Sequence, residues 1–144
     1  RKSIMDNLKE RFNRNGIMNY NGLIVDLTIS DSFKRLPLFD GIIADVPCSG
    51  SGTWSRTPEW LSFFDAALLD EHVSRQRTIV ENICTQLKPG GRLIYLTCSV
   101  FSDENESNVN YFTTNLPLTL KEQHYFQCSD MGGDTLFGAV LVKS

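Results

Sequence analysis

Two continuous apolar runs, residues 41–46 and 92–97, each lead directly into a loop that carries a cysteine. Apolar runs bounded by glycine and proline are typical of buried strands in a parallel sheet. In an open α/β sheet, ligands and chemistry collect at the carboxyl ends of the strands. Cys48 and Cys98 therefore predict one site that holds two thiols.

The rest of the chain alternates helical and extended patterns. Apolar residues at helical spacing predict helices over residues 3–15 and 66–88, and a third that runs from the acidic stretch 102–106 to 115. Further apolar runs predict strands over 22–25, 118–126 and 135–142, with a turn at 131–134. Strands that alternate with helices predict a largely parallel sheet covered on both faces, and the last two strands should be antiparallel.

Length and composition narrow the class of protein. The 144 residues suffice for one domain with a core and are too few for two. The net charge of -3 and the pI of about 5.3 argue against a free-standing nucleic-acid binder, but not against an enzyme whose basic surface lies on another segment. The 4 cysteines form no C-x-x-C pair, so no zinc site is expected. No signal peptide or membrane-spanning run is visible, which favours a reduced, cytoplasmic domain without a membrane partner.

Two sequence blocks carry a family resemblance. Residues 45–53 read DVPCSGSGT, and residues 87–100 contain LKPGG and TCSV, followed by ENE at 104–106. With both blocks in this order, the chain resembles the NOL1/NOP2/Sun family of RNA cytosine-C5 methyltransferases, and the bacterial 16S rRNA members most closely. The resemblance implies a class I (Rossmann-like) methyltransferase fold, α/β, with a mostly parallel sheet and a C-terminal antiparallel hairpin. It also implies S-adenosyl-L-methionine as cofactor and RNA as partner, with rRNA favoured over tRNA.

One part of the family pattern is missing from this chain. The glycine-rich loop that cradles the methionine part of the cofactor has no counterpart, nor has the acidic residue that binds its ribose. Because Arg1 already lies inside an expected helix, we expect residues 1–144 to be a single partial catalytic domain, N-terminally truncated and inactive alone. The missing strands would leave unpaired inner edges at 22–25 and 41–46, which predict self-association or direct pairing of these two strands.

The two thiols suit covalent catalysis on cytosine. C5 of cytosine is a poor nucleophile, and addition of a thiolate to C6 makes C5 reactive toward a methyl sulfonium. A base must then remove the C5 proton so that the thiolate can leave. The residues alone leave the two roles open, and the nucleophile of DNA cytosine methyltransferases follows a proline, as Cys48 does. The closer family resemblance implies that Cys98 is the nucleophile and that Cys48 assists release.

Several neighbours complete the expected site. Asp45 ends an apolar strand, where burial without a partner is costly. The resemblance implies that Asp45 binds the cytosine N3/N4 edge, and the alternative is a cap on local backbone N–H groups. Expected cofactor contacts are Asp26, Asp45 and Pro47, and expected substrate contacts are Ser49, Gly50, Thr97, Ser99 and Arg56.

Three other interpretations compete with this one. Free cysteines are often buried and inert, and we prefer that interpretation for Cys84 and Cys128. A Cys-dependent hydrolase would need His72 or His124 beside a thiol. A non-catalytic, assembly-competent fragment would fold without binding cofactor.

Overall fold

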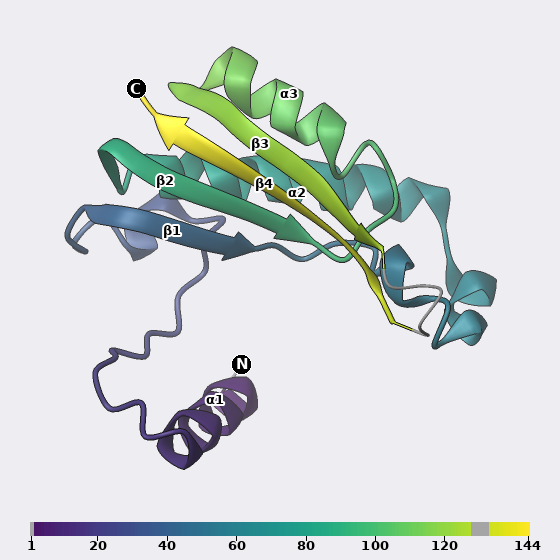
Figure 1. Cartoon of the computed structure of the whole chain (residues 1–144), viewed down its shortest axis with the longest axis horizontal. Helices are drawn as coiled ribbons and strands as arrows, with labels where there is room; N and C mark the ends of the chain where they lie inside the picture. The colour runs from purple at the N-terminus through teal and green to yellow at the C-terminus, as the bar shows by residue number, and fades with distance from the viewer. Residues whose placement is uncertain (1, 128–132) are drawn as a thin grey trace.

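The computed structural model describes residues 2–127 and 133–144 and has helices on one side of a four-stranded sheet (Figure 1). No helix in these ranges is long and apolar enough to cross a membrane. The α-helices are α1 (Lys2–Arg14), α2 (Ala66–Cys84) and α3 (Glu106–Asn115). The strands are β1 (Phe39–Asp45), β2 (Leu87–Thr97), β3 (Leu118–Gln127) and β4 (Thr135–Lys143), and short 3-10 helices η1 (Ser30–Ser32), η2 (Ser51–Thr53) and η3 (Pro58–Phe63) lie in the loops.

The strands lie in the order β1-β2-β4-β3. β1 and β2 are parallel and are joined through α2, whereas β4 runs antiparallel to both β2 and β3. The predicted C-terminal hairpin is therefore confirmed, although its turn at 131–134 lies partly outside the described residues. Parallel pairing is confined to β1 and β2 in the part of the chain that the structure describes.

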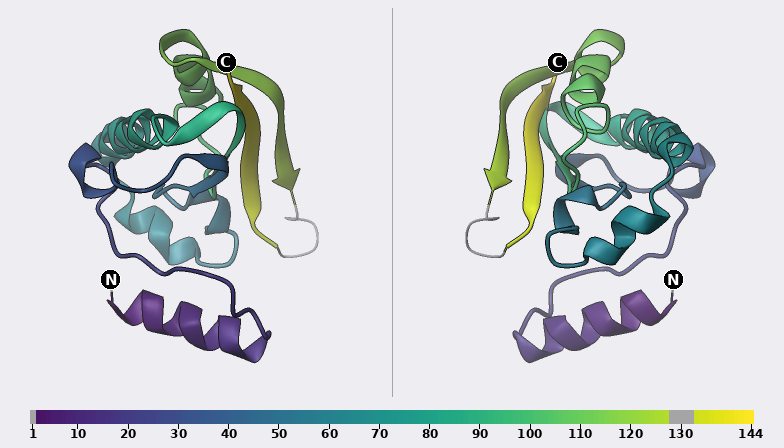
Figure 2. Two further views of the ribbon diagram at one scale, coloured as in Figure 1. Left: turned by 90° about the vertical axis from the view of Figure 1, so that its left-hand side faces the viewer. Right: turned by 90° about the vertical axis from the view of Figure 1, so that its right-hand side faces the viewer.

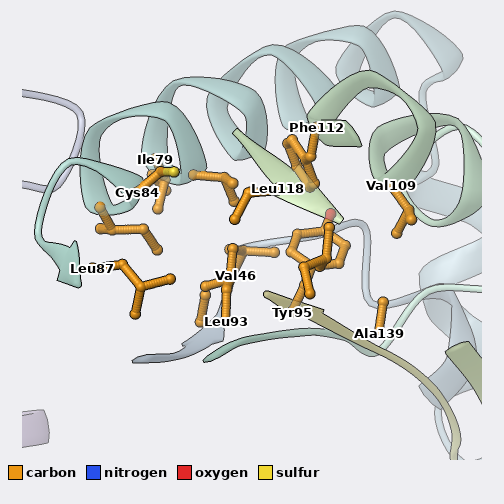
Figure 3. Close-up of a cluster of buried hydrophobic side chains, with 14 of the residues drawn as sticks. Val46, Ile79, Cys84, Leu87, Leu93, Tyr95, Val109, Phe112, Leu118 and Ala139 are labelled. Atoms are coloured by element: carbon orange, nitrogen blue, oxygen red, sulfur yellow. The ribbon is translucent and has the colours of Figure 1, made fainter. Parts of the chain in front are cut away.

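The core fills the space between the sheet and helices α2 and α3 (Figure 3). Leu93 and Tyr95 of β2 point toward the helices, and the Tyr95 ring meets Phe112 of α3 edge to face at 5.2 Å between centroids. The opposite face of the sheet leaves Ile43 of β1 70% exposed. The prediction of helices on both faces is wrong for the described residues, because α2 and α3 pack on the same face and α1 stands apart (Figure 2).

Residues 22–25 do not form the predicted strand. They are extended but unpaired, and Leu23 and Ile24 are 55% and 61% exposed. An apolar run becomes a strand only when a neighbouring strand satisfies its backbone groups, and none lies beside this segment in the described chain. The predicted direct pairing of 22–25 with 41–46 is therefore not observed, and β1 pairs on one side only.

α2 ends at Cys84, four residues before the predicted end at Lys88. Leu87 continues the helical spacing of apolar residues, yet it belongs to β2 and pairs with Phe39. A residue remote in sequence supports this end, since the Lys143 ammonium donates hydrogen bonds of 2.8 Å to the carbonyl oxygens of both Cys84 and Leu87. A cation at a helix C-terminus satisfies free carbonyls and opposes the helix dipole, which stabilises the early stop.

Candidate active site

The two thiols meet at the carboxyl ends of the parallel strands, as the sequence predicts. Cys48 follows β1 and Cys98 follows β2, and their sulfur atoms lie 3.3 Å apart. The backbone N–H of Cys98 also donates to Cys48 Sγ at 3.3 Å. Both side chains are partly buried, so the pair is shielded from bulk solvent and still reachable.

The two thiols have different acidities. A hydrogen bond from the Cys48 thiol to the Cys98 sulfur stabilises the Cys98 thiolate and lowers the pKa of Cys98 to about 7. The same bond, together with burial, raises the pKa of Cys48. Since the thiolate is the nucleophilic form of cysteine, Cys98 is the more reactive thiol near neutral pH.

Glycine shapes the loop after Cys48 at two positions. Gly50 has φ 73°, a left-handed conformation that a side chain disfavours, and its carbonyl accepts bonds from the backbone and hydroxyl of Thr53. At Gly52 a Cβ would lie 2.0 Å from the Thr135 carbonyl oxygen. The Gly52 N–H donates to the Cys98 carbonyl at 2.9 Å, so this glycine lets the two cysteine loops lie against each other.

A buried carboxylate, which the sequence analysis missed, lies beneath the Cys48 loop. Glu104 is 0% exposed, and its oxygens accept hydrogen bonds from the backbone and hydroxyl of Ser49, at 2.9 and 2.6 Å. The sequence suggested an exposed acid in the first turn of a helix. α3 instead begins at Glu106, which leaves Glu104 in the preceding turn and directed inward. The ENE sequence that follows Cys98 was the available signal for this residue, but the burial of Glu104 was not predictable.

The predicted substrate residues beside Cys98 are also buried. The Thr97 hydroxyl donates to Asn105 Oδ1 at 2.6 Å, and Ser99 Oγ lies 3.2 Å from Ser51 Oγ. Asn105 Nδ2 in turn donates to the carbonyl oxygen of Ser99 at 2.9 Å. These contacts hold both flanks of Cys98, and a contact of Thr97 or Ser99 with a substrate stays a prediction.

The predicted cofactor residues line two adjoining hollows beside β1. Asp45 and Pro47 line a mostly apolar hollow of about 250 Å³, and Asp26 and Pro47 line one of about 320 Å³ with Arg75. Leu27, Pro47 and Ile79 belong to both. The Asp45 side chain is exposed, which corrects the expectation of a buried carboxylate, since it lies on the open side of β1.

The Asp26 carboxylate is engaged locally. Its Oδ1 accepts bonds from the backbone N–H of Thr28 at 2.9 Å and from the Thr28 hydroxyl at 2.6 Å. The hydroxyl bond is the main reason that the pKa of Asp26 is lowered. Both bonds use Oδ1, which orients the carboxylate.

Arg56 joins the Cys48 loop to the start of β4. Its guanidinium donates two bonds to the Asp134 carboxylate, at 2.6 and 2.8 Å, and its side chain is 56% exposed. Each partner stabilises the charged form of the other, which raises the pKa of Arg56 and lowers that of Asp134. A substrate contact by Arg56 would therefore compete with this pair, and the contact stays a prediction.

An aromatic surface borders the loop that follows Cys48. The rings of Trp54, Phe64 and Phe101 pack together, and Trp60 and Phe63 of η3 are 57% and 72% exposed. A hollow of about 170 Å³ lies among these side chains and reaches Ser49. The sequence signal was available, since residues 54–64 are rich in aromatic residues, but spacing alone did not place them beside the thiols.

The remaining cysteines and histidines lie away from the sulfur pair. Cys84 is buried in the core, where desolvation raises the pKa of its thiol, as expected for an inert cysteine. Cys128 lies outside the described residues. Among the described residues no hydrogen bond joins a histidine to a cysteine, since His72 lines the aromatic hollow and His124 contacts Glu122. The structure thus offers no geometry for a Cys-His hydrolase in the described part of the chain.

Strand order and known structures place the protein in a fold class, that of class I methyltransferases. The chain aligns with the crystal structure of PH0851 at TM-score 0.90 and 28% identity, which covers 99% of this chain and 35% of that one. It aligns with NSun6 from Pyrococcus horikoshii with SFG at TM-score 0.86 and 22% identity, over 99% and 39% of the two chains. The predicted fold class is confirmed.

Within this class the chain belongs to the family of 16S rRNA methyltransferases RsmB/F, whose family model matches residues 1–135. It is 35% identical over 116 residues to ribosomal RNA small subunit methyltransferase B of Pasteurella multocida (strain Pm70), and 36% identical over 99 residues to methyltransferase F of Enterobacter sp. (strain 638). These matches cover 73% and 69% of this chain, but 26% and 19% of the relatives, so the chain spans about a quarter of their length. The family resemblance is confirmed, and the methyl donor of this family is S-adenosyl-L-methionine.

Proposed function

We propose that this chain carries the reacting thiols of an S-adenosylmethionine-dependent methyltransferase that modifies cytosine C5 in RNA, with rRNA as the substrate. The observation that carries the proposal is the pair of sulfurs 3.3 Å apart at the carboxyl ends of β1 and β2. Methylation of an already nucleophilic nitrogen or oxygen would need no thiol. Two adjacent thiols of unequal acidity suit a reaction that needs a nucleophile and then a second group for release.

The hollows beside β1 fit part of the cofactor. Their shared wall of Leu27, Pro47 and Ile79 is apolar and suits the flat adenine ring, and the Asp26 carboxylate can accept a bond from a ring amino group. Asp45 lines the apolar hollow and is close enough to Cys98 for its charge to raise the pKa of that thiol. When bound there, the cofactor supplies an electrophilic methyl group.

The first step is addition to the base. The Cys98 thiolate attacks C6 of cytosine, a C–S bond forms, and the electron pair of the C5–C6 bond moves toward C5. We assign Asp45, exposed at the end of β1, to hold the N3/N4 edge of the base. C5 would then accept the methyl group of the bound cofactor, whose sulfonium sulfur would leave as a neutral thioether.

The second step releases the product. A base removes the proton from C5, the C5–C6 double bond re-forms, and the electron pair of the C–S bond returns to Cys98. Cys48 is placed for this step, because its sulfur touches that of Cys98 and hence lies near the new C–S bond. Once Cys98 is bonded to carbon, the hydrogen bond that raises the pKa of Cys48 is lost. Cys48 then releases its proton to solvent, and the resulting thiolate takes the proton from C5.

The aromatic surface next to Ser49 suits single-stranded RNA. Exposed rings stack on unpaired bases, and each stacked base contributes about 1–3 kcal/mol. We predict that Trp60→Ala weakens binding of a cytosine-containing RNA strand by about tenfold, because the Trp60 ring is 57% exposed. Filter binding measures the change. Leu61→Ala is the matched control, since Leu61 is equally exposed but offers no ring; equal losses in both variants would contradict stacking.

One observation favours a second candidate function, in which the chain needs a further segment before it can catalyse methylation. β1 pairs only with β2 in the described sheet, and an open strand edge readily accepts a further strand. The family's glycine-rich cofactor loop is also missing from this sequence. We therefore propose that methylation by this chain requires strands added at the β1 edge, and that the chain without them assembles rather than catalyses.

A hybrid enzyme tests both candidates. This chain replaces its aligned segment in methyltransferase B of Pasteurella multocida, and unmodified 16S rRNA is the substrate. We expect 5-methylcytidine, detected by mass spectrometry of nucleosides, from the hybrid but not from the isolated chain. A folded hybrid that binds cofactor and RNA without forming 5-methylcytidine, while the unaltered relative forms it, would refute cytosine C5 methylation. Activity of the isolated chain would refute the need for further strands.

A further inference from the structure

The peptide groups on both sides of Cys48 form hydrogen bonds with buried side chains. The Pro47 carbonyl accepts a bond from Gln76 Nε2 at 3.0 Å, and the Ser49 N–H donates to Glu104 Oε1 at 2.9 Å. Gln76 Nε2 also donates to the same Oε1 at 2.9 Å. Cys48 is thus fixed on both sides through one pair of side chains.

This pair is fully removed from water. Gln76 and Glu104 are both 0% exposed, and no cation lies within ion-pair distance of Glu104 among the described residues. Its carboxylate instead accepts three bonds, from Gln76 and from the backbone and hydroxyl of Ser49. An isolated buried carboxylate is costly, and only a complete set of donors makes it tolerable.

The orientation of Gln76 is imposed by two other elements. Its Oε1 accepts bonds from Asn108 Nδ2 of α3 at 2.7 Å and from the Tyr95 hydroxyl of β2 at 3.1 Å. The amide nitrogen must therefore face Pro47 and Glu104. The single Tyr95 hydroxyl proton is shared with the Glu104 carbonyl oxygen, which is the nearer acceptor at 2.7 Å. The support beneath Cys48 is built from α2, β2 and α3, which makes it rigid.

We propose that Glu104 and Gln76 are positioning residues that hold Cys48 at hydrogen-bonding distance from Cys98. Their meaning for catalysis rests on the proposed function. Their effect on the distance between the two sulfurs does not rest on it, because the sulfur pair is present before cofactor or RNA binds. The contact between the two sulfurs depends on the backbone conformation of Pro47 and Ser49. Without the bonds that fix this conformation, Cys48 would move away from Cys98.

The alternative is that Glu104 acts only through its charge. The titratable groups that influence Cys98 are Cys48, Asp45 and Glu104. The Cys48 hydrogen bond lowers the pKa of Cys98, whereas the charges of Asp45 and Glu104 raise it. Loss of a positioning Glu104 therefore raises the pKa of Cys98, and loss of a merely repulsive charge lowers it. The two roles predict opposite signs.

Two substitutions at Glu104 separate these roles in the present chain. In Glu104→Gln, the new Oε1 accepts from Ser49 N–H and Gln76, and the new amide donates to the Ser49 hydroxyl, which can accept. We expect its Cys98 pKa to stay at about 7 or fall slightly. In Glu104→Ala the support is lost, so we expect the pKa to rise toward the ordinary value of 9.0 and alkylation of Cys98 at pH 7 to slow about tenfold.

The measurement is the rate of iodoacetamide alkylation against pH, followed at Cys98 by peptide mass spectrometry. It requires neither cofactor nor RNA, so its failure is distinct from failure of the proposed function. Asp103→Asn is the charge control in the same turn, because Asp103 is exposed. Val109→Ala is the stability control, because Val109 is buried in the core, in α3. Both should leave the Cys98 profile unchanged.

A lower Cys98 pKa in both Glu104 variants would overturn the proposal, and so would an unchanged profile in a folded Glu104→Ala protein. If Glu104→Ala does not fold, Gln76→Ala decides the question. This variant removes the bond to Pro47 and leaves the Ser49 bonds in place. We expect an intermediate rise in the Cys98 pKa, and a profile identical to that of the parent chain would again overturn the proposal.

Discussion

Cys98→Ala is expected to abolish 5-methylcytidine formation by the hybrid enzyme, with a loss of about 10⁴-fold or more. Without the Cys98 thiolate nothing adds to C6, and C5 keeps the low nucleophilicity of an aromatic carbon. Cys48 cannot substitute, because burial, which remains in this variant, raises the pKa of its thiol. The measurement is the amount of 5-methylcytidine per 16S rRNA, together with a denaturing gel for covalent protein–RNA species.

The control is Cys84→Ala, which removes a thiol from the core at a distance from the site. This variant should lose stability and keep its turnover at temperatures where it is folded. A stable RNA adduct in Cys98→Ala would reverse the assignment and make Cys48 the nucleophile. That outcome would match the order seen in DNA cytosine methyltransferases, where the nucleophile follows a proline.

Cys48→Ala should have a different consequence: the covalent adduct between Cys98 and RNA accumulates. Addition and methyl transfer do not require Cys48, whereas loss of the C5 proton does, so the reaction stops at the methylated adduct, before the product is released. Nearly all enzyme should appear as an RNA adduct on a denaturing gel, while turnover falls about 10²–10⁴-fold.

The same variant should change the pH dependence of adduct formation. Loss of the Cys48 hydrogen bond removes the main cause that lowers the pKa of Cys98, so the thiolate forms only at higher pH. Adduct formation should therefore be slow at pH 7 and increase toward pH 9. Turnover without adduct in Cys48→Ala would show that another group removes the proton.

The sulfur pair was predictable because it depends on local features. Two apolar runs followed by loops identify strand ends, and parallel strands bring their carboxyl ends together. The sequence could not reveal which thiol is more acidic, because the direction of the bond between Cys48 and Cys98 depends on loop conformation. The lowered pKa of Cys98 favours the nucleophile that the family resemblance implies, and this assignment stays a prediction.

Features that depend on distant partners were missed. Glu104 was assigned to a helix start, and its burial depends on Ser49, 55 residues away, and on Gln76, 28 residues away. The end of α2 was misplaced, and Lys143, remote in sequence, supports its actual position. The run 22–25 has the composition of a strand and lacks a neighbour. Composition thus predicts the capacity to form an element, and remote contacts decide whether and where it forms.

The position of β4 has a consequence for synthesis of the protein on the ribosome. β4 is made after β2 and β3, yet it lies inside the sheet between them. β3 therefore emerges with no partner, and β2 keeps one side unpaired until β4 arrives. The C-terminal half of the sheet cannot form progressively during translation; it closes in one late step. During that interval the edges of β2 and β3 are exposed, and protection from aggregation depends on how quickly β4 inserts.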